Sequence, residues 1–468
     1  LAGIRAAAGP GTKVTFARGG PLATGLADLQ VVPGSALSTQ GGPGRVAGLA
    51  AAYYRGHFDG APVLSRLDAA IDFDWADRSP DPSLEDDGFG VRWTGLITAP
   101  VTGRYTLGVR CANACRLLLD DKPVAQGRSD HEPTTITGTV TLRAGQSYPI
   151  RVELEHEKYD AVVQLLWEKP GGRGDEVAEA LAAARSADAV VLVLGLSSRL
   201  EGEEMPVPVE GFAGGDRTSL DLPQVQQALM ESVVAAAQGK PVVLVLLSGS
   251  ALSPTWADGH VPAIVQAWYP GQAAGTAVAE VLFGNVSPTG RLPVTFYRSA
   301  GDLPAFDDYS MRNRTYRYFE GAPLYPFGHG LSYSRFAYGR LAVPRNAAVG
   351  ATVGVAVEVR NAGDVAADEV VQLYVTDLEA SAEVPRLALK GFRRVSLRPG
   401  EKRTVRFTLD ERAFSLVGAD GRRIVEPGRF RIAVGGKQPG LRGTADAATT
   451  GVLSAELELL GAAKALAP

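Results

Sequence analysis

The residues best suited to chemistry in this chain of 468 residues lie in one acidic segment, residues 200–223 (LEGEEMPVPVEGFAGGDRTSLDLP). The segment carries four glutamates: Glu201, Glu203, Glu204 and Glu210. Its prolines and its Gly-Gly pair exclude a regular helix or strand and predict a long loop. Glutamates on a loop can donate a proton, bind a metal or form a solvated surface turn, and the loop alone leaves these alternatives open.

The elements on either side of this loop place it at the end of a strand. Residues 189–194 (AVVLVL) form an apolar run that is typical of a fully buried strand. Residues 221–237 predict a helix, with Asp221 and Gln224 forming a start that resembles a capping box. In open α/β sheets ligands bind at the carboxyl ends of the strands, so the acidic loop is the candidate site.

Further strands and helices extend this α/β pattern. Residues 241–247 and 264–268 predict strands that alternate with helices, which indicates a mostly parallel sheet covered on both faces. Residues 1–8 predict a helix and residues 13–17 a strand of the same layer. Because this beginning is typical of the middle of an α/β unit, we expect the chain to continue on its N-terminal side.

Two other regions have the pattern of all-β domains. Residues 46–170 contain many short strands separated by Gly, Pro and Asp turns, which predicts a sandwich or barrel. This β domain interrupts the α/β pattern and is therefore an insertion between residues 1–45 and residues 171–335. Residues 336–468 predict an immunoglobulin-like or fibronectin-like sandwich with a tail. The predicted fold class is multidomain, α/β plus all-β.

Composition and charge narrow the class of protein. Hydrophobic residues make up 45% and charged residues 21%, as in an ordinary globular protein. The net charge of −4 gives no electrostatic reason to expect nucleic acid or an anionic membrane surface as a partner. No apolar run approaches the roughly 20 residues that span a bilayer. No phosphate-binding loop and no metal cluster is evident, so we expect no cofactor and no metal.

The only cysteines are Cys111 and Cys115. A disulfide across this short loop is geometrically possible and fits an oxidising compartment, and a buried pair of free thiols is the alternative. The spacing Cys-x-x-x-Cys without a further Cys or a nearby His is poor for zinc.

Two motifs of the first β region carry a resemblance. Residues 93–109 (WTGLITAPVTGRYTLGV) and 150–170 (IRVELEHEKYDAVVQLLWEKP) resemble the PA14 domain. Members of that family often have an Asp-Asp pair with Gly where this chain has Cys111 and Cys115. This departure argues against calcium-dependent sugar binding of the kind known in adhesins.

Four segments together resemble glycoside hydrolase family 3: residues 202–227, 264–296, 315–333 (TYRYFEGAPLYPFGHGLSY) and 389–409. The resemblance implies an α/β-sandwich with a PA14 insertion, followed by a fibronectin-III-like domain. It also implies an exo-acting, retaining β-glycosidase that removes a non-reducing terminal β-D-glucose or β-D-xylose from oligosaccharides and β-glycosides. Such an enzyme needs two carboxyl groups about 5 Å apart, one as nucleophile and one as general acid/base.

In that family the nucleophile is an aspartate of a (β/α)8 barrel that precedes the α/β-sandwich, and this barrel is absent from the 468 residues. We therefore expect a barrel partner, as an N-terminal part or a separate chain, and little activity from this chain alone. Asp74 in residues 71–75 (IDFDW) superficially matches the nucleophile motif. It lies inside the β domain, and we interpret it as a structural strand end.

The resemblance also selects site residues. Gly202 and Glu203 match the family's acid/base motif ahead of Asp216 and Arg217, so Glu203 is the predicted acid/base, with Glu201 as runner-up. A general acid requires a raised pKa, which burial and neighbouring carboxylates would provide. Asp216 and Arg217 are expected to form an ion pair that fixes the loop.

Other residues receive weaker predictions. Three side chains of the loop either contact the sugar or pack the loop: Arg199, Met205 and Phe212. Trp268 and Tyr269 are interpreted as core and turn rather than as a stacking platform for sugar. His329 is expected to make structural hydrogen bonds.

Three hypotheses about the function follow. β-Glucosidase activity is favoured slightly because PA14 insertions are familiar among β-glucosidases. β-Xylosidase activity stands close behind, because residues 309–319 (YSMRNRTYRYF) resemble the β-xylosidase branch. A non-catalytic carbohydrate-binding or assembly module is the alternative from a different class. Polysaccharide chemistry and the Cys pair indicate a periplasmic or secreted protein.

Overall fold

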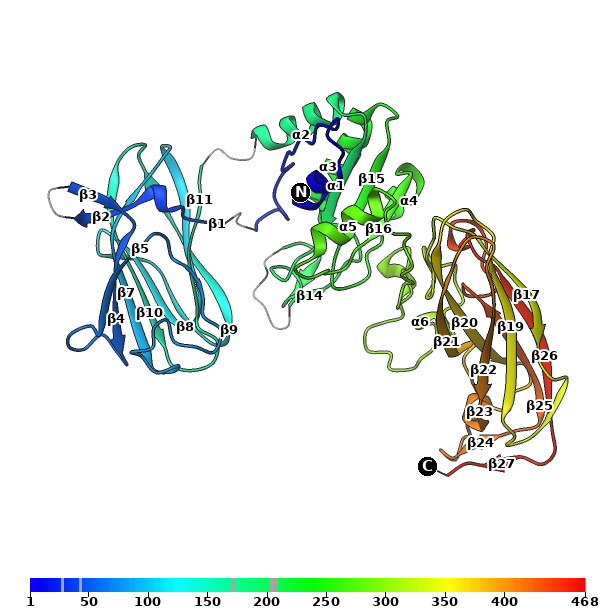
Figure 1. Cartoon of the computed structure of the whole chain (residues 1–468). Helices are drawn as coiled ribbons and strands as arrows, with labels where there is room; N and C mark the ends of the chain where they lie inside the picture. Colours follow the sequence, from blue (N-terminus) through cyan, green and yellow to red (C-terminus); the bar gives the residue numbers. More distant parts are fainter. Residues whose placement is uncertain (27–28, 42–43, 171–173, 203–206, 208, 468) are drawn as a thin grey trace. The chain divides into compact units, whose positions relative to one another are not determined.

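A computed structural model of the chain describes residues 1–26, 29–41, 44–170, 174–202, 207 and 209–467 (Figure 1). It divides into two compact units, one formed by Leu1–Arg18 with Ala180–Pro468 and the other by Gly19–Glu179. The helices are α1 (Ala2–Ala7), α2 (Gly174–Ser186), α3 (Gln224–Ala237), α4 (Thr255–His260), α5 (Ala274–Leu282) and α6 (Thr315–Tyr318), with short 3-10 turns η1 (Gly34–Ala36), η2 (Ala300–Asp302), η3 (Glu411–Phe414) and η4 (Gly443–Ala445). None of the helices among these residues is long and apolar enough to cross a membrane.

The unit Gly19–Glu179 is built from strands. They are β1 (Gln30–Val31), β2 (Leu37–Gly41), β3 (Gly44–Ala47), β4 (Leu49–Arg55), β5 (Leu64–Asp68), β6 (Asp72–Asp74), β7 (Phe89–Thr98), β8 (Gly103–Leu119), β9 (Lys122–Leu142), β10 (Ser147–His156) and β11 (Val162–Glu168). Their pairing is antiparallel, with β8 and β9 forming a long hairpin. Alternate residues of these strands face inward, and the core they form contains the fully buried Tyr53, Trp93 and Tyr105.

Two features of this unit bear on the sequence predictions. Cys111 and Cys115 form a disulfide. Asp74 ends β6, and its carboxylate accepts a hydrogen bond from the backbone N–H of Ala76 at 3.1 Å. Asp74 therefore terminates a strand, as expected.

The α/β part of the other unit contains a parallel sheet in the order β12 (Val190–Gly195), β15 (Val242–Leu247) and β16 (Ala263–Gln266). Helix α3 connects β12 to β15, as a parallel crossover requires. Helix α1 packs against α5, and the contact is so close that a Cβ on Gly3 would lie 2.0 Å from the carbonyl oxygen of Gly275. Glycine is therefore required at the crossing of these two helices.

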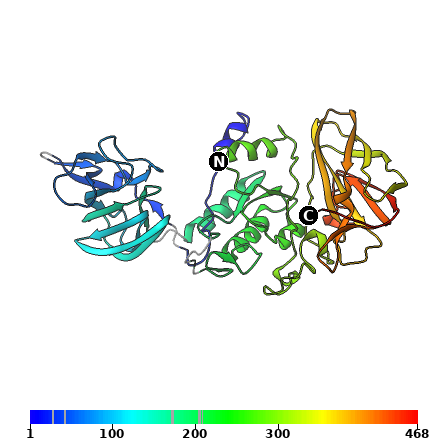
Figure 2. The ribbon, with the colours of Figure 1, turned by 90° about the horizontal axis from the view of Figure 1, so that it is seen from below.

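The C-terminal part of this unit is a β body, coloured yellow to red in Figures 1 and 2. Its strands are β17 (Phe336–Ala342), β18 (Asn346–Ala348), β19 (Val353–Asn361), β20 (Ala367–Asp377), β21 (Ala388–Leu397), β22 (Lys402–Leu409), β23 (Ser415–Val417), β24 (Arg423–Val425), β25 (Gly428–Gly435), β26 (Val452–Leu460) and β27 (Lys464–Ala465). They form the sheets β17-β19-β22, β18-β26-β25-β20-β21 and β23-β24-β27. Strands of the two larger sheets share one apolar core that includes Val357, Val371 and Ile432.

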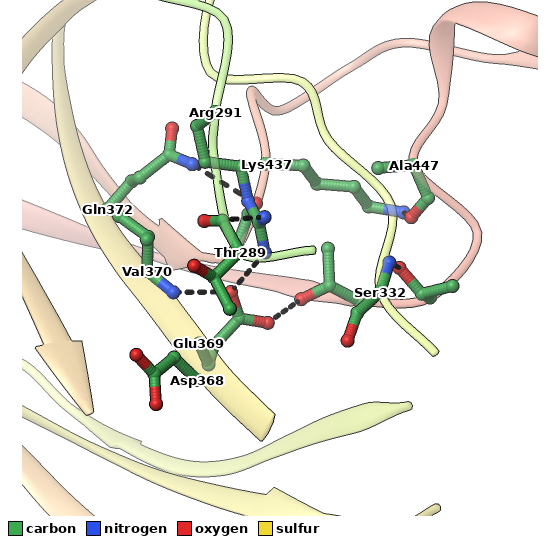
Figure 3. A network of polar contacts seen from close by, with 12 residues as sticks. Thr289, Arg291, Ser332, Asp368, Glu369, Val370, Gln372, Lys437 and Ala447 are labelled. Carbon is green, nitrogen blue, oxygen red and sulfur yellow. Dashed lines mark hydrogen bonds and ion pairs between the residues drawn. The ribbon is translucent and has the colours of Figure 1, made fainter. Parts of the chain in front are cut away.

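A buried polar network joins the α/β part to this β body (Figure 3). Arg291 donates to the carboxylate of Glu369 on β20 at 2.8 Å, and these side chains are 6% and 0% exposed. The other oxygen of Glu369 accepts from the hydroxyl of Thr450 at 2.7 Å, and the N–H of Val370 adds a third hydrogen bond. The buried charge of Glu369 is thereby fully satisfied.

Two local predictions are wrong. Residues 13–17 form no strand, because no described strand pairs with them and an extended segment needs a partner for its backbone groups. Helix α3 begins at Gln224 after Pro223, without a side-chain cap. Asp221 does not cap it, because its carboxylate accepts the hydroxyl of Ser219 at 3.0 Å instead.

Candidate active-site loop

The acidic loop lies where three parallel strands end. Because β12, β15 and β16 are parallel and in register, their carboxyl ends meet at one edge of the sheet. The turns that follow β15 and β16 contain Ser250 and Tyr269, and both reach the loop that follows β12. Gly249, Ser250 and Tyr269 lie 48, 49 and 68 positions from Glu201 along the chain, so only the fold brings them together.

Glu201 is the residue on which these turns converge. One carboxylate oxygen, Oε2, accepts the backbone N–H of Gly249 at 2.9 Å and the hydroxyl of Tyr269 at 2.5 Å. The other oxygen, Oε1, accepts the hydroxyl of Ser250. Glu201 therefore fastens the start of the acidic loop to both neighbouring turns.

These contacts keep Glu201 ionised. Burial by itself raises the pKa of this carboxyl, but hydrogen bonds from Ser250, Tyr269 and Gly249 and the positive charge of Arg217 outweigh it and hold the pKa below its ordinary value. Burial and the neighbouring carboxylate raise the pKa of the Tyr269 hydroxyl, which remains a hydrogen-bond donor. A carboxylate with a lowered pKa is a poorer proton donor than an ordinary one, so these contacts favour a positioning role for Glu201 over the acid/base role for which it was the runner-up.

Arg217 strengthens the same arrangement. Its guanidinium donates to the hydroxyl of Ser250 at 3.0 Å and to the carbonyl oxygen of Ala251 at 2.7 Å. The predicted ion pair between Asp216 and Arg217 is wrong. These adjacent residues form β14 (Asp216–Arg217), and side chains of successive strand residues point to opposite faces.

A small hairpin packs closely against the backbone at Gly202, next to Glu201. Strand β13 (Phe212–Ala213) pairs with β14 through the turn at Gly214 and Gly215. A Cβ on Gly215 would lie 1.6 Å from the carbonyl oxygen of Gly202, and Gly215 has a φ of +88°. Only glycine meets both requirements, so this hairpin fixes the backbone at Gly202.

The predicted site residues fall into two groups. Glu203 and Met205, with Glu204, lie outside the described residues. Arg199 is exposed on the turn after β12, where its backbone N–H donates to the hydroxyl of Ser197 at 3.2 Å. Phe212 is half-buried in β13, opposite Arg217. The structure thus brings the runner-up Glu201 together with Arg217, Ser250 and Tyr269, and it leaves Arg199 and Phe212 outside that cluster.

The sequence analysis missed Ser250 and Tyr269. Their positions directly after two predicted parallel strands could have indicated them, because the carboxyl ends of parallel strands meet at one edge of the sheet. Trp268 packs edge-on against Phe296 and is in the left-handed region with a φ of +58°, which is uncommon for an aromatic residue. The turn at Trp268 sends the next side chain, that of Tyr269, to Glu201, so Tyr269 has a role beyond the turn that we expected.

His329 lies away from this edge. Its ring stacks on Tyr325, and burial lowers the pKa of its imidazole to about 4. The neutral ring is packed at the junction with the β body, but its buried Nδ1 has no hydrogen-bond partner among the described residues, so the predicted structural hydrogen bonds are not all made.

Among the residues that the structure covers, no group of three or more His, Cys, Asp or Glu could hold a metal ion. The described side chains and backbone groups that meet at the strand ends are a carboxylate, hydroxyls, a guanidinium and a backbone N–H.

Comparison with known proteins assigns these parts. Residues 12–333 match the glycosyl hydrolase family 3 C-terminal domain, and residues 369–438 match a fibronectin type III-like domain. The chain is 36% identical over 358 residues to a xylan 1,4-beta-xylosidase of Xylanibacter ruminicola, covering 76% of this chain and 40% of the relative. It is 33% identical over 418 residues to a beta-glucosidase of Rhizobium radiobacter, covering 82% of this chain and 48% of the relative.

A solved structure has a similar fold. The beta-glucosidase from Kluyveromyces marxianus in complex with glucose matches 98% of this chain and 55% of its own, with a TM-score of 0.69 and 26% identity. The chain therefore spans about half or less of the length of these relatives. From the match over residues 12–333 we conclude that this chain belongs to glycosyl hydrolase family 3, of which it contains the C-terminal domain and a fibronectin type III-like domain.

Proposed function

We propose that this chain supplies the general acid/base of an exo-acting, retaining β-glycosidase, with Glu203 as that residue. The observation that carries the proposal is the anchoring of Glu201, two residues earlier, by Gly249, Ser250 and Tyr269. An ionised, triply hydrogen-bonded Glu201 leaves the proton-donating role to another carboxyl of the loop. It also supplies a negative charge near that carboxyl, which raises the pKa of a neighbouring acid.

The nucleophile of this mechanism would come from a (β/α)8 barrel, as a further part of the protein or as a separate chain. The substrate would be a β-linked oligosaccharide or glycoside from which a terminal β-D-glucose or β-D-xylose is removed. Glu203 would protonate the leaving oxygen and then, as its carboxylate, activate the water that releases the sugar from the nucleophile. The relatives include enzymes named for either sugar, and this supports both activities.

The test of Glu203 is Glu203→Gln in the enzyme assembled with its barrel. Turnover of β-glycosides with poor leaving groups should fall by about 10²–10⁴-fold, because their departure needs a proton. For activated aryl glycosides kcat/KM should be affected much less, and azide should restore their turnover, because this anionic nucleophile attacks the glycosyl-enzyme without help from a base. Glu210→Gln, on the same loop and exposed, is the matched control. Unchanged turnover of poor substrates by Glu203→Gln would refute the assignment.

The two sugars are distinguished by kcat/KM for aryl β-glucosides and aryl β-xylosides with the same leaving group. Xylose lacks the exocyclic CH2OH group of glucose, so the preferred sugar shows whether the pocket of the barrel accommodates that group. A ratio above about tenfold corresponds to about 1.4 kcal/mol of differential transition-state binding and would decide the assignment.

A non-catalytic module for carbohydrate binding or assembly is the second candidate, because the chain spans only about half of its relatives. Under this hypothesis the unit Gly19–Glu179 is a PA14-like module that binds carbohydrate or mediates assembly outside the cell or in the periplasm. Co-purification of a barrel-sized chain that confers hydrolysis would exclude this candidate. Binding of β-glycans without hydrolysis in the assembled protein would favour it.

A further inference from the structure

The C-terminal β body contains a cavity of about 210 Å³ that the proposed catalysis does not use. It opens between the end of β20, the start of β21, the small sheet β23-β24 and helix α6. Its floor is apolar, with Val375, Phe414, Leu416 and Phe430 all at most 5% exposed. A cavity of this size accommodates a single small molecule, and such sites combine an apolar floor with a few directed polar groups.

Three cationic side chains line this cavity: Arg317, Lys390 and Arg423. They come from α6, β21 and β24, which are separate elements. Within the described part of the chain, none of the three has a carboxylate within the 4.0 Å of an ion pair. These three side chains are exposed, and against the two carboxylates of the lining, Asp377 and Glu383, they leave a net positive charge of one.

Lys390 is directed by an irregularity of the sheet. In the pairing of β20 with β21, Leu373 faces Gly391 and Tyr374 faces Leu389, so Lys390 is the extra residue of a β-bulge. Bulges redirect a side chain and are frequent beside functional sites. Partial desolvation of this otherwise exposed side chain and the charges of Arg317 and Arg423 lower the pKa of the Lys390 ammonium.

Arg317 is held by a short helix with a strained start. Thr315, the first residue of α6, has a φ of +55°, which is unfavourable for a β-branched residue. The strain persists because α6 is tied to the β body: the Tyr316 hydroxyl accepts the N–H of Leu389 at 3.1 Å, and the Arg317 carbonyl accepts the N–H of Arg386 at 2.8 Å. Local strain of this kind marks segments whose position matters.

Two acidic side chains, Asp377 and Glu383, complete the lining without pairing with the three cations. Carboxylates in such a position accept hydrogen bonds from ligand hydroxyls, whereas guanidinium and ammonium groups bind an anion. The cations of the lining can bind an acid group, and its carboxylates can bind hydroxyls. The lining therefore suits a molecule that carries one acid group and several hydroxyls. An apolar floor beneath them suits the carbon face of a sugar ring.

We propose that this cavity binds a sugar acid of the uronate class. The carboxylate of the ligand would lie among Arg317, Lys390 and Arg423, and its hydroxyls would face Asp377 and Glu383. The site would make this part of the enzyme a receptor for acidic sugars. It is independent of the acidic loop, so its test needs no hydrolysis and its failure leaves the proposed activity unaffected.

Titration calorimetry of the whole chain with D-glucuronate tests the proposal. We expect saturable binding that weakens with salt, and no binding of D-glucose at the same concentrations, since the neutral sugar lacks the acid group. Lys390→Met should reduce the affinity for glucuronate by about tenfold or more, while Lys390→Arg keeps a substantial part of it. Arg345→Leu removes an exposed cation that does not line the cavity and should leave binding unchanged.

Three results would overturn the assignment. Absence of glucuronate binding, with the chain folded by circular dichroism, excludes the site. Equal binding of acetate or inorganic phosphate shows a general anion site rather than one for a sugar acid. Equal losses in Lys390→Met and Arg345→Leu show that net charge, and not the cavity, governs binding.

Discussion

Two regions of the same unit each hold a carboxylate with three hydrogen-bond donors, but their surroundings differ. At the junction with the β body, Glu369 is fully buried and faces Arg291 at 2.8 Å (Figure 3). At the strand ends, Glu201 is partly exposed, and its donors are two hydroxyls and one backbone N–H. Burial raises the pKa of the carboxyl of Glu369, while hydrogen bonds prevail over burial at Glu201 and lower its pKa.

The difference separates a structural role from a positioning role. A fully buried carboxylate carries a large desolvation cost, so its partners stabilise the fold and their loss destabilises it. A partly exposed carboxylate contributes little to stability when its pairs are broken, because water replaces them. We therefore expect substitutions at the junction to change the free energy of unfolding and substitutions at the strand ends to change activity.

The largest effect on stability is expected for Arg291→Met. This change leaves the carboxylate of Glu369 buried beside Thr450 without its positive partner. The free energy of unfolding should fall by about 3–5 kcal/mol, measured by denaturant unfolding of the whole chain. The exposed pair Arg394–Asp368, 3.7 Å apart, supplies the control, and Arg394→Met should cost about 1 kcal/mol or less. Equal costs for the two variants would remove the distinction between junction and surface.

The junction should also govern stability in acid. Burial lowers the pKa of the His329 imidazole to about 4, from about 6.5 in the unfolded chain, so the native state binds fewer protons than the unfolded state between these values. The stability that this group contributes is complete above about pH 6.5 and is lost as the pH falls to about 4. The loss over this window is about 3 kcal/mol from the size of the shift.

His329→Gln should remove that part of the pH dependence, seen as a flatter plot of unfolding free energy against pH between about 6.5 and 4. His260→Gln changes an exposed histidine and is the control. If the two variants keep the slope of the wild type, His329 does not carry the acid sensitivity of the junction.

The sequence predicted these two regions unequally. Apolar runs and turn residues were enough to identify the parallel strands and the C-terminal β body, because strand period and buried apolar length are local signals. The acidic loop was identified as the candidate site from its place after β12. The contacts of Glu201 with Ser250 and Tyr269 were not predictable, because they depend on three strand ends meeting. The pairing of Arg291 with Glu369 was missed for the same reason, since these residues are 78 positions apart.

Local rules also failed where a competing partner was present. Asp221 was expected to cap α3, but Ser219 binds its carboxylate. Residues 13–17 have the composition of a strand, yet a strand forms only beside another strand. In both cases the structure depends on a partner, or on the lack of one, that the sequence of the segment itself does not identify.

At the strand ends, Glu201→Gln should affect activity more than stability. The amide cannot accept hydrogen bonds from Ser250, Tyr269 and Gly249 together, so residue 201 should lose its fixed position. A shift of about 1 Å costs up to about 10²-fold in rate, and we expect kcat/KM of the barrel-assembled enzyme to fall by roughly this factor. Azide should not rescue this variant, which distinguishes a positioning residue from an acid/base. A loss of unfolding free energy as large as that of Arg291→Met would contradict the assignment.

The smallest effect at the strand ends is expected from substitutions of two adjacent glycines. Gly214 and Gly215 both have positive φ values, +60° and +88°, but only Gly215 faces the carbonyl oxygen of Gly202. Alanine at either position carries a backbone cost of about 1 kcal/mol. Gly215→Ala additionally forces the backbone at Gly202 to move, so it should lower both the melting temperature and, several-fold, kcat/KM relative to Gly214→Ala. Equal activities of the two variants would show that the position of Gly202 has no influence on the activity proposed for the acidic loop.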